Sequence, residues 1–206
     1  MEVFFQIALL HLFAVASPGP DFILILRQSF RYEKKISIYT SLGIGLGVLL
    51  HSLFAIMGVS LILVYNEFLF TIFKVAAIFY LLFLGFRSIF QQSKETTPQD
   101  PNKFLTLSKG KAFLTGLITN LSNPKAFLFF IAIFTLIGID LQIHYKIMSG
   151  VYMSVATFIW FSIIAITLDS SKKISKIHNY LPFLESFTGL ILVIIALRIL
   201  FKELII

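Results

Sequence analysis

Long apolar segments separated by short polar ones make up almost the whole chain of 206 residues. Six such segments cover residues 3–26, 38–64, 68–90, 112–138, 147–168 and 181–201. Each meets the roughly 20 residues that a helix needs to cross a bilayer. The pattern predicts an all-α membrane protein with six transmembrane helices, and it leaves no room for a soluble catalytic domain.

The composition agrees with this interpretation. Hydrophobic residues make up 58% of the chain and charged residues 13%, and the mean hydropathy is +0.92. These values lie well away from the usual balance of a soluble domain. The chain contains no cysteine, which excludes disulfides and thiolate metal sites.

The net charge of +7 comes from basic residues that gather in alternate loops. The first, third and fifth loops and their borders contain Arg27, Arg31, Lys34, Lys35, Arg87, Lys94, Lys103, Lys109, Lys111, Lys172, Lys173 and Lys176. The second loop has none, and the fourth has Lys146 alone. Because loops rich in Lys and Arg stay in the cytoplasm, both termini are predicted to lie outside. The charge is a topology signal and does not indicate a nucleic-acid partner.

The polar segment 91–110 predicts a flexible cytoplasmic linker within one transmembrane domain that spans 1–206. It separates a first repeat of three helices (3–90) from a second (112–201). Because three is odd, the second repeat is inverted in the membrane relative to the first, as in many transporters. One shift of the sequence aligns Pro20 with Pro124, and a second, slightly larger shift aligns Arg87 with Arg198.

Prolines interrupt the first and fourth predicted helices. Proline has no N–H and clashes with the preceding turn, so Pro18, Pro20 and Pro124 free carbonyl groups of a continuous helix. The freed carbonyls are those of Ala14, Ala16 and Asn120. In hydrocarbon they need other partners. One interpretation is a kink packed by neighbouring helices, and the other is a binding site, which paired interruptions in two repeats favour.

The chemistry around the two breaks suits a zwitterion. Each break is followed by a half-helix whose N-terminal N–H groups attract an anion such as a carboxylate. The freed carbonyls and the carboxylate of Asp21 suit an ammonium group. The predicted substrate-binding residues are Pro18, Gly19, Pro20, Asp21, Asn120, Asn123, Pro124 and Lys125.

Three of these residues also have a structural interpretation. Asp21 lies deep in its segment, where a carboxylate is functional by default, as a substrate or proton site; alternatively it caps the second half-helix. Lys125 can pair with Asp21 or meet a substrate carboxylate, or it can extend toward an interface. Asn123 can bind substrate or only cap the helix that follows.

His51 is predicted to be the only histidine deep in a span. An imidazole exchanges a proton near neutral pH, which makes His51 the second candidate, beside Asp21, for proton coupling. The alternative is a neutral ring hydrogen-bonded between helices. Gly43 and Gly47 form a small-xxx-small surface, which predicts close helix packing and also suits a homodimer contact.

Four motifs carry a family resemblance: SPGPDFILIL at 17–26, SLGIGLGVLLHSLFAIMG at 41–58, FKVAAIFYLLFLGFRSI at 73–89 and GLITNLSNPKAFLFFIAIF at 116–134. Together they resemble the LysE/RhtB family of amino-acid exporters, with a weaker echo at 189–200. The resemblance implies a six-helix protein of the bacterial inner membrane that exports amino acids or related small zwitterionic or cationic metabolites, in exchange for protons. The chain departs from the family at His51, where relatives often have an acidic residue.

Other functions fit the sequence less well. The nearest alternative is an exporter of another small solute, such as a metal cation or a toxic metabolite, on the same scaffold. The sequence has no G-x-x-x-x-G-K-[ST] motif, so ATP is not the expected energy source, and no cofactor or resident metal is expected. Only Asp21 and His51 are titrating groups near the middle of a span, so an enzyme is not expected. The expected partners are an amino-acid-like substrate, protons and the lipid bilayer.

Overall fold

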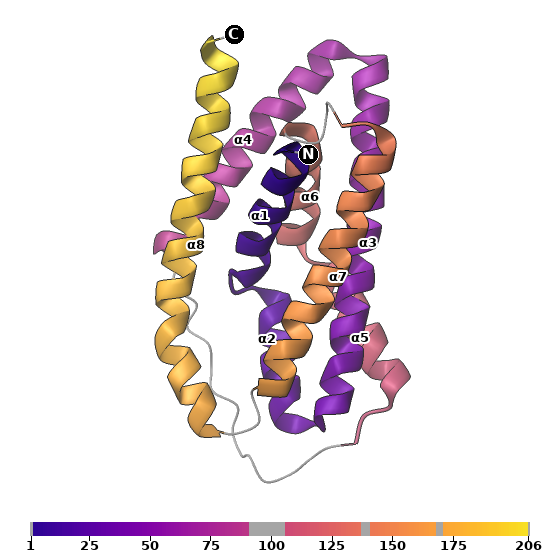
Figure 1. Cartoon of the computed structure of the whole chain (residues 1–206), viewed down its shortest axis with the longest axis vertical. Helices are drawn as coiled ribbons and strands as arrows, with labels where there is room; N and C mark the ends of the chain where they lie inside the picture. Colours follow the sequence, from indigo (N-terminus) through magenta and orange to yellow (C-terminus); the bar gives the residue numbers. More distant parts are fainter. Residues whose placement is uncertain (1, 91–105, 137–140, 168–170, 206) are drawn as a thin grey trace.

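The computed structural model describes residues 2–90, 106–136, 141–167 and 171–205, and within them the regular structure is entirely α-helical. The helices are α1 (Glu2–Ala16), α2 (Pro20–Arg31), α3 (Lys34–Tyr65), α4 (Glu67–Phe90), α5 (Lys109–Leu121), α6 (Pro124–Leu136), α7 (Ile143–Thr167) and α8 (Ser171–Ile205). Most of them run along the long axis of the molecule, with α4 tilted across them (Figure 1). The fold is that of a helical membrane protein.

Two of the predicted spans are broken at their prolines. The α1–α2 pair bends by 55° and the α5–α6 pair by 59°. Pro20 is the first residue of α2 and Pro124 the first of α6, where the missing N–H costs the helix nothing. The prediction of broken first and fourth helices is confirmed.

The number of spans is established only in part. The described helices α3, α4 and α7 are long and apolar enough to cross a membrane, and counting each bent pair as one span gives up to five. The apolar part of α8 runs only from Ser186 to Phe201. The sixth span and the inverted repeat therefore stay predictions.

Two predicted loop boundaries differ from the structure. The helix α8 begins at Ser171, so Lys172, Lys173 and Lys176 belong to a helix and not to the predicted fifth loop. A helix does not have to end where its apolar segment ends, because its hydrogen bonds are internal. Most of the predicted linker 91–110 lies outside the described residues, and its last residues, 109–110, begin α5 behind the cap of Ser108.

Glycines bring α3 and α5 into direct backbone contact. A Cβ built on Gly43 would lie 2.0 Å from the carbonyl oxygen of Phe113, and one built on Gly116 would lie 2.1 Å from that of Thr40. A Cβ on Gly47 would lie 2.5 Å from Oδ1 of Asn120. The Gly43 and Gly47 surface is thus occupied by α5 of the same chain, and it is not available for the homodimer contact that the sequence suggested.

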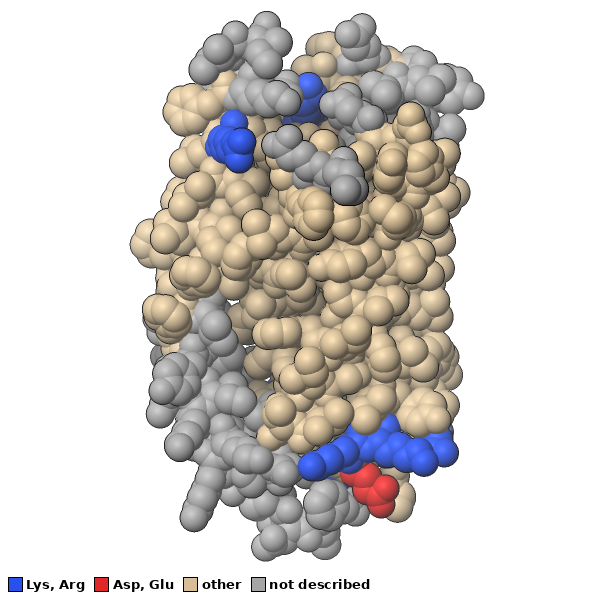
Figure 2. Space-filling view, viewed as in Figure 1, with Lys and Arg blue, Asp and Glu red and all other residues tan. Residues whose placement is uncertain are grey.

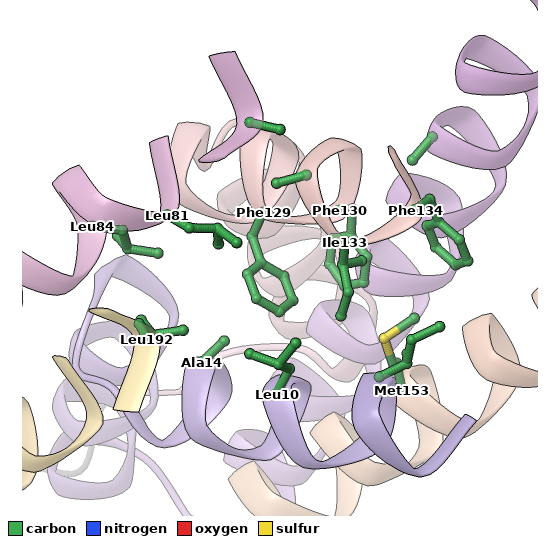
Figure 3. Packing of buried hydrophobic residues seen from close by; sticks show 14 of the residues in the cluster. Leu10, Ala14, Leu81, Leu84, Phe129, Phe130, Ile133, Phe134, Met153 and Leu192 are labelled. Atoms are coloured by element: carbon green, nitrogen blue, oxygen red, sulfur yellow. The ribbon is translucent and has the colours of Figure 1, made fainter. Parts of the chain in front are cut away.

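Aromatic residues of α6 fill the centre of the bundle. Phe129, Phe130 and Phe134 are at most 3% exposed. Phe129 lies opposite Leu10 and Ala14 of α1, and Phe134 lies toward Met153 of α7 (Figure 3). Because lipid is as apolar as these side chains, their stabilising contribution comes from close packing and not from removal of water. This packing holds α1 and α6, which flank the two breaks, against each other.

On the face seen in Figure 2, the charged residues gather near the two ends and none is visible in the middle, and the larger cluster of Lys and Arg lies at one end. The end of α2 and the starts of α3 and α5 meet at that end of the molecule, whereas the start of α1 and the end of α8 lie toward the other (Figure 1). The exposed basic residues on these three helix termini are Arg31, Lys34, Lys35, Lys109 and Lys111.

Candidate functional site

The two breaks face each other, and Asp21 lies where they meet. Asp21 is the second residue of α2 and follows the break at residues 17–19 directly. Its Oδ2 accepts hydrogen bonds from Nδ2 of Asn120 at 2.9 Å and from Nδ2 of Asn123 at 3.1 Å. Asn120 lies in the last turn of α5 and Asn123 directly before α6. The polar side chains of the second break thus bind the carboxylate of the first.

Lys125 makes the reciprocal contact. Its Nζ donates to the carbonyl oxygen of Ser17 at 3.0 Å and to that of Pro18 at 3.4 Å. Its own carbonyl accepts a hydrogen bond from the Tyr80 hydroxyl at 3.2 Å. The sequence pointed to the carbonyls of Ala14 and Ala16, but those that receive the ammonium are the next ones along, because residues 17–19 leave the helix altogether. The sequence predicted that carbonyls at the break would bind the ammonium of a substrate. In the structure they bind the ammonium of Lys125.

His51 reaches the second break from α3. Its Nε2 lies 3.0 Å from the carbonyl oxygen of Asn120, which is the group that Pro124 was predicted to free. A carbonyl can only accept, so this geometry requires the proton on Nε2. The ring stacks on Phe130, with centroids 6.0 Å apart and planes at 11°. Nδ1 is buried and has no hydrogen-bond partner within the described residues.

A cavity of about 60 Å³ lies beside this network, between α1, α3, α6 and α7. Its polar side is formed by Asp21, Asn120, Asn123 and Lys125, and its apolar side by aromatic rings of α2, α6 and α7. The volume corresponds to roughly two water molecules. In the described part of the chain, Oδ1 of Asp21 is buried without a hydrogen-bond partner. A buried acceptor of this kind is costly to leave unpaired, so it favours a bound donor.

His11 and Thr157 are polar residues of this cavity that the sequence analysis did not select. His11 lies in α1 and is 2% exposed, so the expectation that His51 is the only histidine deep in a span is wrong. Its Nε2 lies 3.0 Å from Oγ1 of Thr157, from α7. The sequence contained the information needed to select His11, because it is the only polar residue in the apolar run from Ile7 to Ala16. An ionisable residue inside a span is a candidate functional residue by default.

The predicted site residues fall into three groups. Those that line the 60 Å³ cavity are Gly19, Asp21, Asn120, Asn123 and Lys125. The three prolines, Pro18, Pro20 and Pro124, line a second cavity of about 410 Å³ between α2, α4 and α6. His51 lines neither cavity, but it contacts two residues that line the smaller one, Asn120 through a hydrogen bond and Phe130 through ring stacking. The fold therefore brings the predicted residues of the two breaks together.

Comparison with known proteins places the chain in a family. A model described as LysE type translocator matches residues 12–203. The chain belongs to this family. The matched range contains both breaks and nearly all of the residues around them; His11 lies immediately before it. The family relationship and the apolar helices identify a multi-pass membrane protein of a transporter family.

Several curated relatives span nearly the same length. A threonine efflux protein of Salmonella typhimurium is 29% identical over 192 residues, which cover 92% of this chain and 93% of the relative. The threonine efflux protein of Escherichia coli strain K12 is 28% identical over 192 residues, with the same coverage. An uncharacterized membrane protein of Bacillus subtilis, YrhP, is 27% identical over 191 residues, covering 87% of this chain and 89% of the relative. No solved structure matches the chain.

Proposed function

We propose that this protein is a secondary transporter that exports amino acids, or related small zwitterionic or cationic metabolites, from the cytoplasm. The observation that carries the proposal is the meeting of the two broken helices at Asp21, in a chain related over most of its length to threonine efflux proteins. A zwitterion needs an acceptor for its ammonium and donors for its carboxylate. Both kinds of group lie at the breaks.

The carboxylate of Asp21 supplies the acceptor. Its Oδ2 is held by Asn120 and Asn123, while Oδ1 has no partner among the described residues and lies beside the cavity. A substrate ammonium would donate to Oδ1 without disturbing the two amides. The carbonyls of Ser17 and Pro18 are a second acceptor pair, available when Lys125 moves away. The N-termini of α2 and α6, which carry the positive ends of the helix dipoles, would attract the carboxylate of the substrate.

Exchange for protons is the proposed driving force, and Asp21 is the better of the two coupling candidates. An exchanged proton must be able to bind a group that also senses the substrate. Each candidate has one unpaired acceptor among the described residues, Oδ1 of Asp21 and Nδ1 of His51, but only Asp21 lines a cavity that a substrate could enter. His51 then acts by supporting the break between α5 and α6.

The proposed setting is the bacterial inner membrane, with both termini outside. The cluster of Lys and Arg at one end of the molecule, opposite the start of α1 and the end of α8, supports cytoplasmic placement of the α2–α3 connection and of the start of α5 (Figure 2). In the predicted inverted-repeat arrangement, 3–90 and 112–201 rock against each other about the two breaks.

The test is efflux from a strain deleted for its own amino-acid exporters and expressing this protein. Cells are fed a panel of dipeptides to raise internal amino acids, and internal and external pools are followed over time. We expect export of one or a few amino acids above the level of an Asp21→Asn variant that inserts normally. No difference across the panel, with the protein verified in the membrane, would overturn the proposal and make metal and toxin resistance the next screen.

A further inference from the structure

The larger cavity adjoins the 60 Å³ cavity and is bounded by α4 in place of α1, α3 and α7. It has a volume of about 410 Å³ and lies between the start of α2, the C-terminal half of α4 and the start of α6. Ligand sites that bury most of a small molecule have volumes of about 300–1,000 Å³. The larger cavity therefore has room for a whole amino acid, whereas the 60 Å³ cavity does not.

Cations are the only charged groups among the described residues that line the larger cavity. Arg87 comes from α4 and Lys125 from α6, and the remaining polar groups include the Tyr80 hydroxyl, Ser88 and the side chain of Asn123. Within the described residues, no hydrogen bond or ion pair engages the guanidinium of Arg87. The planar fork of a guanidinium matches a carboxylate in two parallel hydrogen bonds, which a lysine ammonium does not reproduce.

The two cavities have three lining residues in common: Gly19, Asn123 and Lys125. Lys125 therefore stands in the wall between them, with its Nζ on the carbonyls of Ser17 and Pro18. A Cβ on Gly19 would lie 3.6 Å from both Cδ and Nζ of Lys125, at ordinary contact distance, so the Lys125 side chain passes directly beside the first break. When a substrate ammonium replaces Lys125 at the carbonyls, the carboxylate on the same carbon atom can point into the larger cavity.

We propose that the larger cavity is a carboxylate-binding subsite, in which Arg87 and Lys125 bind the carboxylate of an amino acid while its ammonium lies at the break. The inference rests on the proposed function and deepens it. It assigns to Arg87 a role beyond the orientation signal that a basic residue at a helix end provides. It also excludes amines without a carboxylate as good substrates.

The experiment uses the full-length protein in liposomes and measures exchange of radiolabelled threonine, chosen because relatives are threonine efflux proteins. Unlabelled threonine and threoninamide, which has the same shape without the negative charge, compete with the label. The variants are Arg87→Gln, Arg87→Lys and Ser88→Asp. Arg198→Gln is the matched control, because Arg198 is exposed on α8 and lines neither cavity.

In the unmodified protein we expect threonine to compete at least about tenfold better than threoninamide, since a site built for one group rejects an analogue that lacks it. In Arg87→Gln the preference should fall to about threefold or less through weaker competition by threonine alone. Arg87→Lys should retain part of it because the charge remains, and Arg198→Gln should retain all of it.

Each alternative outcome has a definite meaning. If the unmodified protein exchanges no amino acid, the proposed function fails. If it exchanges threonine and Arg87→Gln keeps the full preference over threoninamide, the carboxylate subsite is wrong while the function stands. Equal loss for both competitors also contradicts the subsite. Should Arg87→Gln fail to fold, Ser88→Asp decides, because an added carboxylate in this cavity must weaken threonine more than threoninamide.

Discussion

Asn120 donates a hydrogen bond over 2.9 Å to the carboxylate of Asp21, although the two residues are 99 positions apart in the chain. Asn120 lies at the end of α5, the first helix of one broken pair, and Asp21 lies at the start of α2, the second helix of the other pair. The ammonium of Lys125 makes the return contact with the carbonyl of Ser17. Each break is thus stabilised by side chains from the other, so neither can be rearranged without affecting both.

The first prediction concerns the charge of Asp21. Asp21→Asn keeps an oxygen that can accept from Asn120 and Asn123, so the protein should reach the membrane in normal amounts. Loss of the negative charge should lower amino-acid efflux by about tenfold or more, the effect of losing roughly 1.4 kcal/mol of binding. The measurement is efflux after dipeptide feeding, with Glu33→Gln as the control because Glu33 is exposed. Full-rate export by Asp21→Asn would remove Asp21 from the site.

The second prediction concerns the stability contributed by Lys125. Lys125→Met removes the donor to the carbonyls of Ser17 and Pro18, and a buried acceptor left unpaired costs about 1–3 kcal/mol. We expect a lower melting temperature in detergent together with reduced transport. Lys111→Met, an exposed lysine at the start of α5, should change neither. An unchanged melting temperature for Lys125→Met would mean that water replaces the ammonium.

The third prediction concerns the contact of α3 with α5. Gly43→Ala places a methyl group 2.0 Å from the carbonyl oxygen of Phe113, so the helices must separate at a cost of at least about 1–3 kcal/mol. Gly58→Ala lies in the same helix with nothing within 4 Å of the new Cβ and should be neutral or slightly stabilising. The difference in melting temperature between these variants measures the packing. Equal melting temperatures would refute the close approach.

The fourth prediction separates the two candidates for proton coupling. In His51→Gln the side-chain amide can still donate to the carbonyl of Asn120, but it cannot take up and release a proton during transport. If Asp21 couples transport to protons, His51→Gln in liposomes should retain stimulation by a pH gradient, whereas Asp21→Asn should lose it. His51→Leu, which lacks any donor, should be destabilised by about 1 kcal/mol. Loss of the gradient response in His51→Gln, with exchange intact, would transfer the coupling role to His51.

The sequence predicted the positions of the breaks because their cause is local. Proline lacks an N–H wherever it occurs, so Pro18, Pro20 and Pro124 interrupt their helices whatever surrounds them. The apolar length of each segment likewise required membrane helices. The predicted helix ends were less accurate. The apolar segment begins at residue 181, but α8 already begins at Ser171, because the hydrogen bonds of a helix are internal and do not require apolar side chains.

Tertiary structure decided which groups complete the site. Asp21 meets Asn120 and Asn123, and His11 meets Thr157, which is 146 positions away. Such pairings depend on how the helices cross. In a membrane both the lipid-facing and the core-facing sides of a helix are apolar, so hydrophobic periodicity carries little information about which side packs. Amino-acid type and spacing alone thus determined where the helices break and what chemistry the breaks can offer. Only the packing of α1, α3, α6 and α7 decided that the two breaks face each other, with His11 beside them.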